Sequence, residues 1–270
     1  MQTVTPPPAT GIRSGLAPPA PAEPAASAGE GSTPEQHSIP LSIALHLGPG
    51  LLIGALYFAT LPLAQRWGLP TLVALSFAGA AVMLPLVIGG LFARRKGRDL
   101  RAAWREAVPY RTSLPWWQYL VWIPVVLFAA GAASGLLAPL GALIHDGLFP
   151  GVPAPSPLAA PVGSTGMAAF WLVVCSVALV IVVPTLEEIY FRGFLMPRLD
   201  RFKVWAPVIG TVLFALYHTW TPWHGPARIA VVLPLAYVAY RKRNLWIGIV
   251  VHMLANSGDM IAAAVQLARD

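Results

Sequence analysis

The sequence predicts an all-α membrane protein, a polytopic bundle of about seven transmembrane helices. Three observations support this prediction. Hydrophobic residues make up 56% of the 270 residues and charged residues only 11%, which is unusual for a soluble protein. The hydrophobic residues form long runs, most of which could cross a hydrocarbon core about 30 Å thick at about 1.5 Å per residue. The 18 Lys and Arg residues fall in short clusters between these runs, which is typical of membrane proteins rather than nucleic-acid-binding proteins.

The segment 1–39 precedes the first apolar run and is rich in Pro, Ala, Ser and Gly. Such a composition cannot bury enough apolar surface to offset the conformational entropy that is lost on folding, so we expect a disordered cytoplasmic tail. A signal peptide is not expected, because the segment has no basic cluster followed by an apolar stretch.

Seven apolar spans follow the tail, and each is expected to form a helix. The fifth and sixth spans are short, and Pro234 interrupts the sixth, so this pair is expected to form a hairpin that stops short of the far membrane face. The expected helices cover residues 41–65, 71–93, 115–143, 167–190, 205–220, 227–241 and 245–267.

Basic residues on alternate loops predict the orientation of the bundle. Most of the Lys and Arg residues lie in the connections after the second, fourth and sixth spans, whereas the opposite loops carry only Arg66 and Arg228. Basic loops stay in the cytoplasm, so the N-terminus is expected inside and the C-terminus outside. The composition resembles that of bacterial proteins, which points to the inner membrane. Residues 98–111 mix cations with apolar side chains, a pattern that fits an interfacial helix or a solvated loop equally well.

Four polar side chains from three late spans are expected at a similar depth in the membrane. If the fourth helix continues to about Pro197, Glu187 lies about 15 Å above its cytoplasmic end at about 1.5 Å per residue. The same arithmetic places His218 about 20 Å up the fifth helix, and His252 and Asn256 about 12 and 18 Å up the seventh. Ionisable groups at such depths are costly in hydrocarbon and indicate a functional site.

The spacing of these residues within each helix predicts which of them share a face. Glu188 and Arg192 can pair at i,i+4, while Glu187, about 100° round the helix, is left to face another helix. An acid, two imidazoles and a carboxamide in a low-dielectric cleft form a hydrolytic set, with a base for water and donors for an oxyanion. The pairs that share a face are Glu188 and Arg192, Phe214 and His218, and His252 and Asn256.

In their order along the chain, these pairs resemble the three motifs of the CPBP family, the CAAX prenyl proteases and bacteriocin-processing proteins that are also called the ABI family. The resemblance covers about residues 167–267. It divides the chain into the tail 1–39, three N-terminal helices with a basic loop over 40–166, and a catalytic core over 167–270 formed by the last four helices.

The resemblance implies a glutamate-dependent intramembrane endopeptidase whose site opens toward the cytoplasm. Glu187 with His218 would activate the attacking water, and His252 with Asn256 would stabilise the tetrahedral oxyanion. The supporting residues would be Glu188 and Arg192, which hold the helix end and the base in position, together with Phe214. No cofactor is expected. A zinc protease is the less favoured alternative, because two His and a Glu could bind zinc but do not form an HExxH motif.

Each residue alone also fits a plainer structural interpretation, such as an interhelical hydrogen bond or an interface anchor. Two other functions remain open, a non-catalytic immunity or scaffold protein of the same fold and a proton-coupled transporter. The absence of a visible inverted repeat disfavours the transporter. His46 is expected to be structural or to line the substrate path.

The expected partner of a peptidase is a membrane-associated protein or peptide, with no role for nucleic acid. Peptide maturation, bacteriocin-related processing and removal of a C-terminal sorting signal fit the family resemblance equally well.

Overall fold

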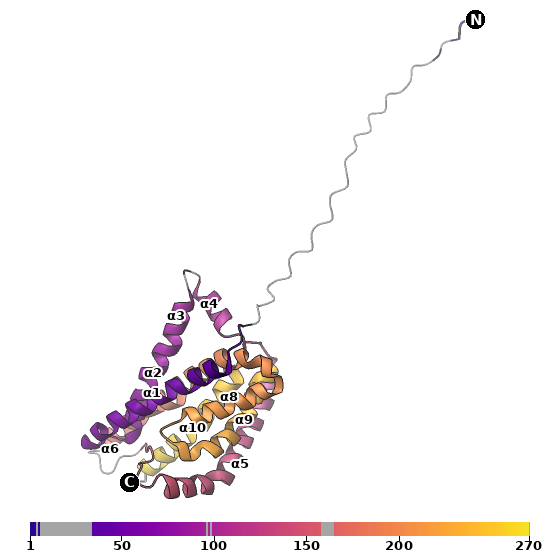
Figure 1. Ribbon diagram of the computed structural model, residues 1–270. Helices are drawn as coiled ribbons and strands as arrows, with labels where there is room; N and C mark the ends of the chain where they lie inside the picture. The colour runs from indigo at the N-terminus through magenta and orange to yellow at the C-terminus, as the bar shows by residue number, and fades with distance from the viewer. Residues whose placement is uncertain (4, 6–33, 96, 98, 158–164, 270) are drawn as a thin grey trace. The chain divides into compact units, whose positions relative to one another are not determined.

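The computed structural model describes residues 1–3, 5, 34–95, 97, 99–157 and 165–269, and every regular element in these residues is a helix (Figure 1). The chain divides into two units, Met1–Ser32 and Thr33–Asp270, and the helices lie in the second. Residues 4 and 6–33 of the expected tail, 1–39, lie outside the described residues. The first helix begins at Ile39, where the Ser38 hydroxyl accepts a hydrogen bond from the Leu41 amide and caps the helix.

The helical segments correspond one by one to the seven expected spans. The first three are α1 (Ile39–Arg66), then α2 (Thr71–Leu84) continued by η1 (Pro85–Gly89) and α3 (Gly90–Arg95), and α5 (Trp116–Leu148). The fourth combines α6 (Thr165–Ser176), η2 (Val177–Val182), α7 (Val183–Glu187) and η3 (Glu188–Leu195). The last three are α8 (Ala206–Tyr217), α9 (Gly225–Lys242) and α10 (Trp246–Leu267). The connections contain α4 (Leu100–Ala107), η4 (Met196–Trp205) and η5 (Pro222–His224).

Five helical stretches of the described residues are long and apolar enough to cross a membrane, so the protein is a multi-pass membrane protein. One of them, Thr165–Tyr217, contains the fourth expected span and most of the fifth, which are separated by a kink at Lys203, where φ is 52°. The 18-residue α9 is not among the five. The number of seven crossings therefore stays a prediction.

The α8–α9 pair has the form of the expected hairpin. The two helices pack against each other and are joined by a short connection that contains η5. The 12 residues of α8 extend over only about 18 Å at about 1.5 Å per residue, against about 30 Å for a hydrocarbon core. The end of α8 therefore lies within the depth of the longer helices.

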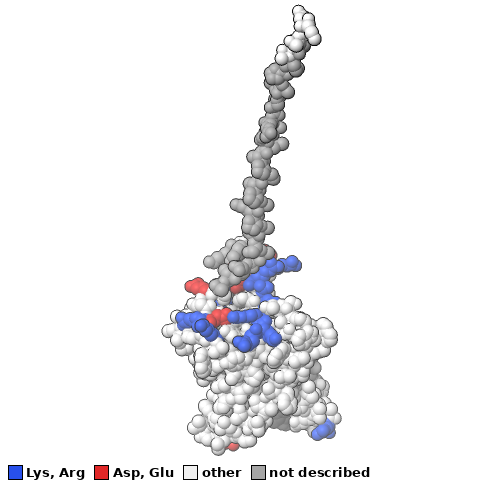
Figure 2. Space-filling view, turned by 90° about the vertical axis from the view of Figure 1, so that its right-hand side faces the viewer, with Lys and Arg blue, Asp and Glu red and all other residues white. Residues whose placement is uncertain are grey.

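The three basic connections meet at one end of the helical body, as the alternation of charge predicted. The amide of Leu245 donates to the Tyr110 carbonyl at 3.0 Å, and the Tyr110 hydroxyl donates to Asp200 at 2.7 Å. Figure 2 shows Lys and Arg side chains gathered at this end, with a broad uncharged surface beyond it. We call it the basic end. Residues 100–107 form a helix there, α4, which buries Ala103 and Ala107 and exposes Arg101.

The helices differ in how much of their surface is exposed and how much is packed in the core. Phe128 and Leu136 on α5 are 79% and 80% exposed, as expected for side chains that face hydrocarbon. The main core lies between α1, α2, α8 and the helices from α6 to η3, around buried aromatic residues such as Tyr57, Phe214 and Tyr217. The glutamates of the fourth span lie next to this core.

Candidate active site

The two adjacent glutamates lie where the fourth helical span changes its winding. Glu187 ends α7, and Glu188 begins the π-helical segment η3. Wider π-helical turns are often found at functional sites, because they change the direction of side chains within a continuous helix. Glu187 is 4% exposed and Glu188 is fully buried. Two carboxylates are therefore held away from solvent, and their partners determine what each can do.

Glu188 is the carboxylate with cationic and imidazole partners. Its Oε1 lies 3.1 Å from Arg192 Nη1, which confirms the predicted i,i+4 pair, and 3.0 Å from His252 Nδ1 on α10. The Arg192 guanidinium also stacks on the Phe214 ring, 4.2 Å from its centroid. A Cβ on Gly248 would lie 2.6 Å from Glu188 Oε2, so a larger residue at this position would displace the carboxylate. Glu188 thus ties η3 to α10 while its charge is compensated.

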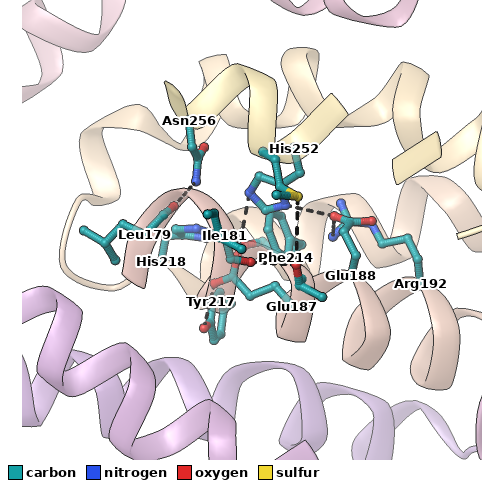
Figure 3. Close-up of polar contacts among 12 residues, drawn as sticks. Leu179, Ile181, Glu187, Glu188, Arg192, Phe214, Tyr217, His218, His252 and Asn256 are labelled. Atoms are coloured by element: carbon teal, nitrogen blue, oxygen red, sulfur yellow. Dashed lines mark hydrogen bonds and ion pairs between the residues drawn. The ribbon is translucent and has the colours of Figure 1, made fainter. Parts of the chain in front are cut away.

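Glu187 faces another helix, as its position 100° away predicted. The Tyr217 hydroxyl at the end of α8 donates to Glu187 Oε1 at 3.0 Å. Its other oxygen, Oε2, lies 3.7 Å from His252 Nε2. Figure 3 shows the His252 ring between the two carboxylates. Arg192 forms its ion pair with Glu188, so the two carboxylates differ in their partners.

His218 lies just beyond its helix rather than inside it, which corrects the expected helix 205–220. The helix α8 ends at Tyr217, and His218 has non-helical backbone angles of φ −80° and ψ 62°. Pro222 starts a new turn shortly afterwards, and α1 packs against this segment through a hydrogen bond from the Thr219 hydroxyl to the Gly50 carbonyl at 2.8 Å. A Cβ on Gly50 would lie 2.0 Å from the Tyr217 carbonyl oxygen, so α1 packs closely against the end of α8 and fixes its position.

The contacts of His218 define its hydrogen positions. Its Nδ1 lies 2.9 Å from the Phe214 carbonyl oxygen, and because a carbonyl only accepts, Nδ1 carries the hydrogen. In the neutral ring, Nε2 is then a hydrogen-bond acceptor. The Phe214 ring packs edge-on against His218, with centroids 4.8 Å apart, and lies 6.1 Å from the His252 ring. Phe214 thus packs near both imidazoles.

Asn256 lies one turn beyond His252 on α10. Its Nδ2 donates to the Leu179 carbonyl at 3.0 Å, in the π-helical segment η2, where the regular helical hydrogen bonding is altered. A carboxamide has two N–H groups, so one remains after this contact. The contact orients the amide and links α10 to the fourth span a second time.

One cavity of about 1010 Å³ joins all the site residues predicted from the sequence. Its volume is that of a large ligand pocket, enough for several residues of a peptide. It is lined by Glu187, Glu188, Arg192, Phe214, His218, His252 and Asn256, among others. Within the described part of the chain, however, no hydrogen bond or ion pair joins Glu187 directly to His218.

The cavity also reaches residues that the expected opening toward the cytoplasm does not explain. Its lining includes 154–157 and Gln266. Ser156 contacts Thr71 at the start of α2, and Gln266 lies in the last turn of α10, so both lie at the end of the helices opposite the basic end. His46 does not line the cavity; it is buried and donates through Nδ1 to the Ser42 carbonyl, which makes it structural.

Three further residues belong to the site although sequence reasoning did not single them out. The Tyr217 hydroxyl donates to Glu187, and Gly248 leaves room for the Glu188 side chain. Arg228, which was expected in an outer loop, lines the cavity from α9. Each had a signal. A buried Tyr hydroxyl needs a partner, Gly248 precedes His252 by one helical turn, and an Arg beside a span too short to cross the bilayer can lie inside it.

Arg192 follows the expected fourth span, 167–190, but does not lie in a loop. It is 3% exposed and lies inside the bundle.

Among the residues that the structure describes, no three His, Cys, Asp or Glu side chains group closely enough to hold a metal ion.

Comparison with known proteins places this arrangement in a family. Residues 169–258 match the family described as type II CAAX prenyl endopeptidase, Rce1-like, and this range contains every predicted site residue. Neither the curated proteins nor the solved structures gave a match. The resemblance to the CPBP family is confirmed for one domain: residues 169–258 form an Rce1-like domain of the type II CAAX prenyl endopeptidase family, which is a family of proteases.

Proposed function

We propose that the protein is an intramembrane endopeptidase in which Glu187 and His218 activate water to hydrolyse a peptide bond of a membrane-associated protein or peptide. One observation carries the proposal. Two adjacent buried carboxylates line the same cavity, and Glu188 is paired with Arg192 and His252 whereas Glu187 is held mainly by the Tyr217 hydroxyl. A carboxylate that is positioned by a hydroxyl and has no arginine in an ion pair with it is the one better suited to act as a base.

The water would lie in the cavity between Glu187 and His218, which explains why the two side chains need no direct contact. Glu187 Oε2 and His218 Nε2 both have acceptor capacity, because Tyr217 donates to the other carboxylate oxygen and Phe214 accepts from the other ring nitrogen. One of them removes a proton from the water as it attacks the substrate carbonyl. General base catalysis of this kind contributes about 10²–10⁴-fold to the rate.

The developing oxyanion would be bound by α10. Asn256 offers its second Nδ2 hydrogen, and His252 offers Nε2–H when its ring carries both hydrogens. Glu188 accepts from His252 Nδ1 and so fixes the orientation of the ring. The proton held by the base then passes to the leaving amine, which completes the hydrolysis.

The proposed setting is the bacterial inner membrane, with the basic end in the cytoplasm. The candidate reactions are peptide maturation, removal of a C-terminal sorting signal and bacteriocin-related processing. All three share a substrate that is bound to or inserted in the membrane, which agrees with a cavity bounded by apolar helices.

The test compares the membrane proteomes of cells that express the wild type, Glu187→Gln or Asp146→Asn. Asp146 is the matched control, because it is exposed at the far end of α5 and does not line the cavity. Proteins whose termini are longer in Glu187→Gln cells, but not in Asp146→Asn cells, would be the substrates. Unchanged termini, together with full complementation by Glu187→Gln, would contradict the endopeptidase proposal and favour a non-catalytic protein of the same fold.

A further inference from the structure

Arg228 is a cation in the cavity to which the proposed mechanism gives no task. It lies in the first turn of α9 and lines the cavity together with Glu187, Tyr217 and His218. Its Nη2 donates to the Thr221 hydroxyl at 3.1 Å. Its Nη1 is buried and, among the described residues, has no hydrogen-bond partner.

In the described part of the chain, no hydrogen bond or ion pair joins this guanidinium to an acid, although the Glu187 carboxylate is close enough to attract it electrostatically. The ion pairs within the site join Glu188 to Arg192 and His252, and Glu187 to His252. An ionisable group inside a membrane protein is costly, and a buried N–H donor without an acceptor adds to that cost. An anion that enters the cavity would supply the acceptor that Nη1 lacks.

The surroundings of Arg228 narrow the kind of anion. Val231, Val232 and Leu235 follow it on α9 and also line the cavity, three to seven residues further on and so close to its face of the helix. The planar guanidinium matches a carboxylate with two parallel hydrogen bonds. A carboxylate on an apolar peptide can bind the Arg228 guanidinium while the rest of the peptide contacts the apolar side chains of α9. A free inorganic anion can bind only the guanidinium.

We propose that Arg228 binds a carboxylate of the peptide substrate while the apolar side chains of α9 receive its neighbouring residues; this rests on the proposed endopeptidase function. The carboxylate is either the free C-terminus or an Asp or Glu side chain. Because Arg228 and the pair of Glu187 and His218 line one cavity, this contact fixes how far the cleaved bond lies from the carboxylate. Arg228 thereby determines specificity without taking part in bond cleavage.

Binding of short probes to the full-length Glu187→Gln protein in detergent tests this, measured by isothermal titration calorimetry. N-acetyl-trileucine is compared with its C-terminal amide, and N-acetyl-Leu-Asp-Leu amide with its Asn analogue. We expect one carboxylate probe to bind about tenfold or more tightly than its neutral counterpart, the value of a hydrogen-bonded charge. The pair that shows the preference identifies the source of the carboxylate.

Substitution of Arg228 assigns the preference to this residue. In Arg228→Gln the preference disappears, whereas Arg66→Gln keeps it, because Arg66 ends α1 outside the cavity. Equal binding of the two members of each probe pair to the Glu187→Gln protein would overturn the proposal. A preference for the carboxylate probe that survives in folded Arg228→Gln would also overturn it. If the wild type cleaves nothing while the Arg228-dependent preference is present, hydrolysis is refuted and the carboxylate site stands.

Discussion

At the scale of single residues, two neighbouring glutamates have different partners. A rotation of about 100° between adjacent helical positions sends Glu188 to Arg192 and Glu187 to α8. The sequence was sufficient to predict this separation, because the i,i+4 acid and base are visible in it. It was not sufficient to predict Tyr217 as the partner of Glu187, because that contact depends on where α8 ends against α1.

Tyr217→Phe tests the importance of this partner. Loss of the hydroxyl removes a hydrogen bond to a buried carboxylate, a contact worth about 1.5–3 kcal/mol, so we expect cleavage to slow by about 10- to 100-fold. Tyr190→Phe is the matched control, because the Tyr190 hydroxyl donates to the Leu45 carbonyl outside the cavity. Rates measured on one substrate for both variants decide the matter. Equal rates would show that Tyr217 does not hold the base.

At the scale of elements, close contacts between helices fix the site. Gly50 on α1 contacts the last carbonyl of α8, and Gly248 on α10 contacts Glu188. Helix positions were predictable from the apolar runs, and most boundaries agree within a few residues. The end of α8 was predicted three residues too far, because its termination is set by tertiary contacts with α1 and by the turn before Pro222 rather than by hydrophobicity.

The pair Gly50→Ala and Gly48→Ala tests the role of α1. A Cβ at Gly50 would lie 2.0 Å from a backbone oxygen, which must shift, whereas a Cβ at Gly48 has nothing within 4 Å. We expect Gly50→Ala to cost about 1–3 kcal/mol of stability and to reduce cleavage by displacing His218. Gly48→Ala is expected to be stabilising by about 0.5–1 kcal/mol, as for other helical glycines. Thermal unfolding and rates that do not differ between the two would contradict this role.

At the scale of the whole molecule, the distribution of charged and apolar residues along the chain predicted where the connections between helices lie. The basic connections meet at one end, as their alternation along the chain required. Arg228 was the exception. Its span is too short to cross the bilayer, and sequence alone does not reveal how deep the α8–α9 hairpin lies, so a cavity residue was mistaken for a loop residue.

Cysteine labelling tests the orientation of the bundle, since Cys175 is the single cysteine and is buried. In a Cys175→Ala background, Arg101→Cys at the basic end and Asp146→Cys at the other end both place a thiol at an exposed position. A membrane-impermeant maleimide added to intact spheroplasts should label Asp146→Cys, while Arg101→Cys should need permeabilised membranes. The reverse pattern would place the basic end outside.

The central claim is that Glu187 serves catalysis while Glu188 serves structure. The most direct measurement is the cleavage rate and thermal stability of purified wild type, Glu187→Gln and Glu188→Gln on one substrate. We predict that Glu187→Gln stays folded and loses about 10²–10⁴-fold in rate, whereas Glu188→Gln leaves Arg192 without its carboxylate and loses about 3–5 kcal/mol of stability. Wild-type cleavage by Glu187→Gln would contradict the account.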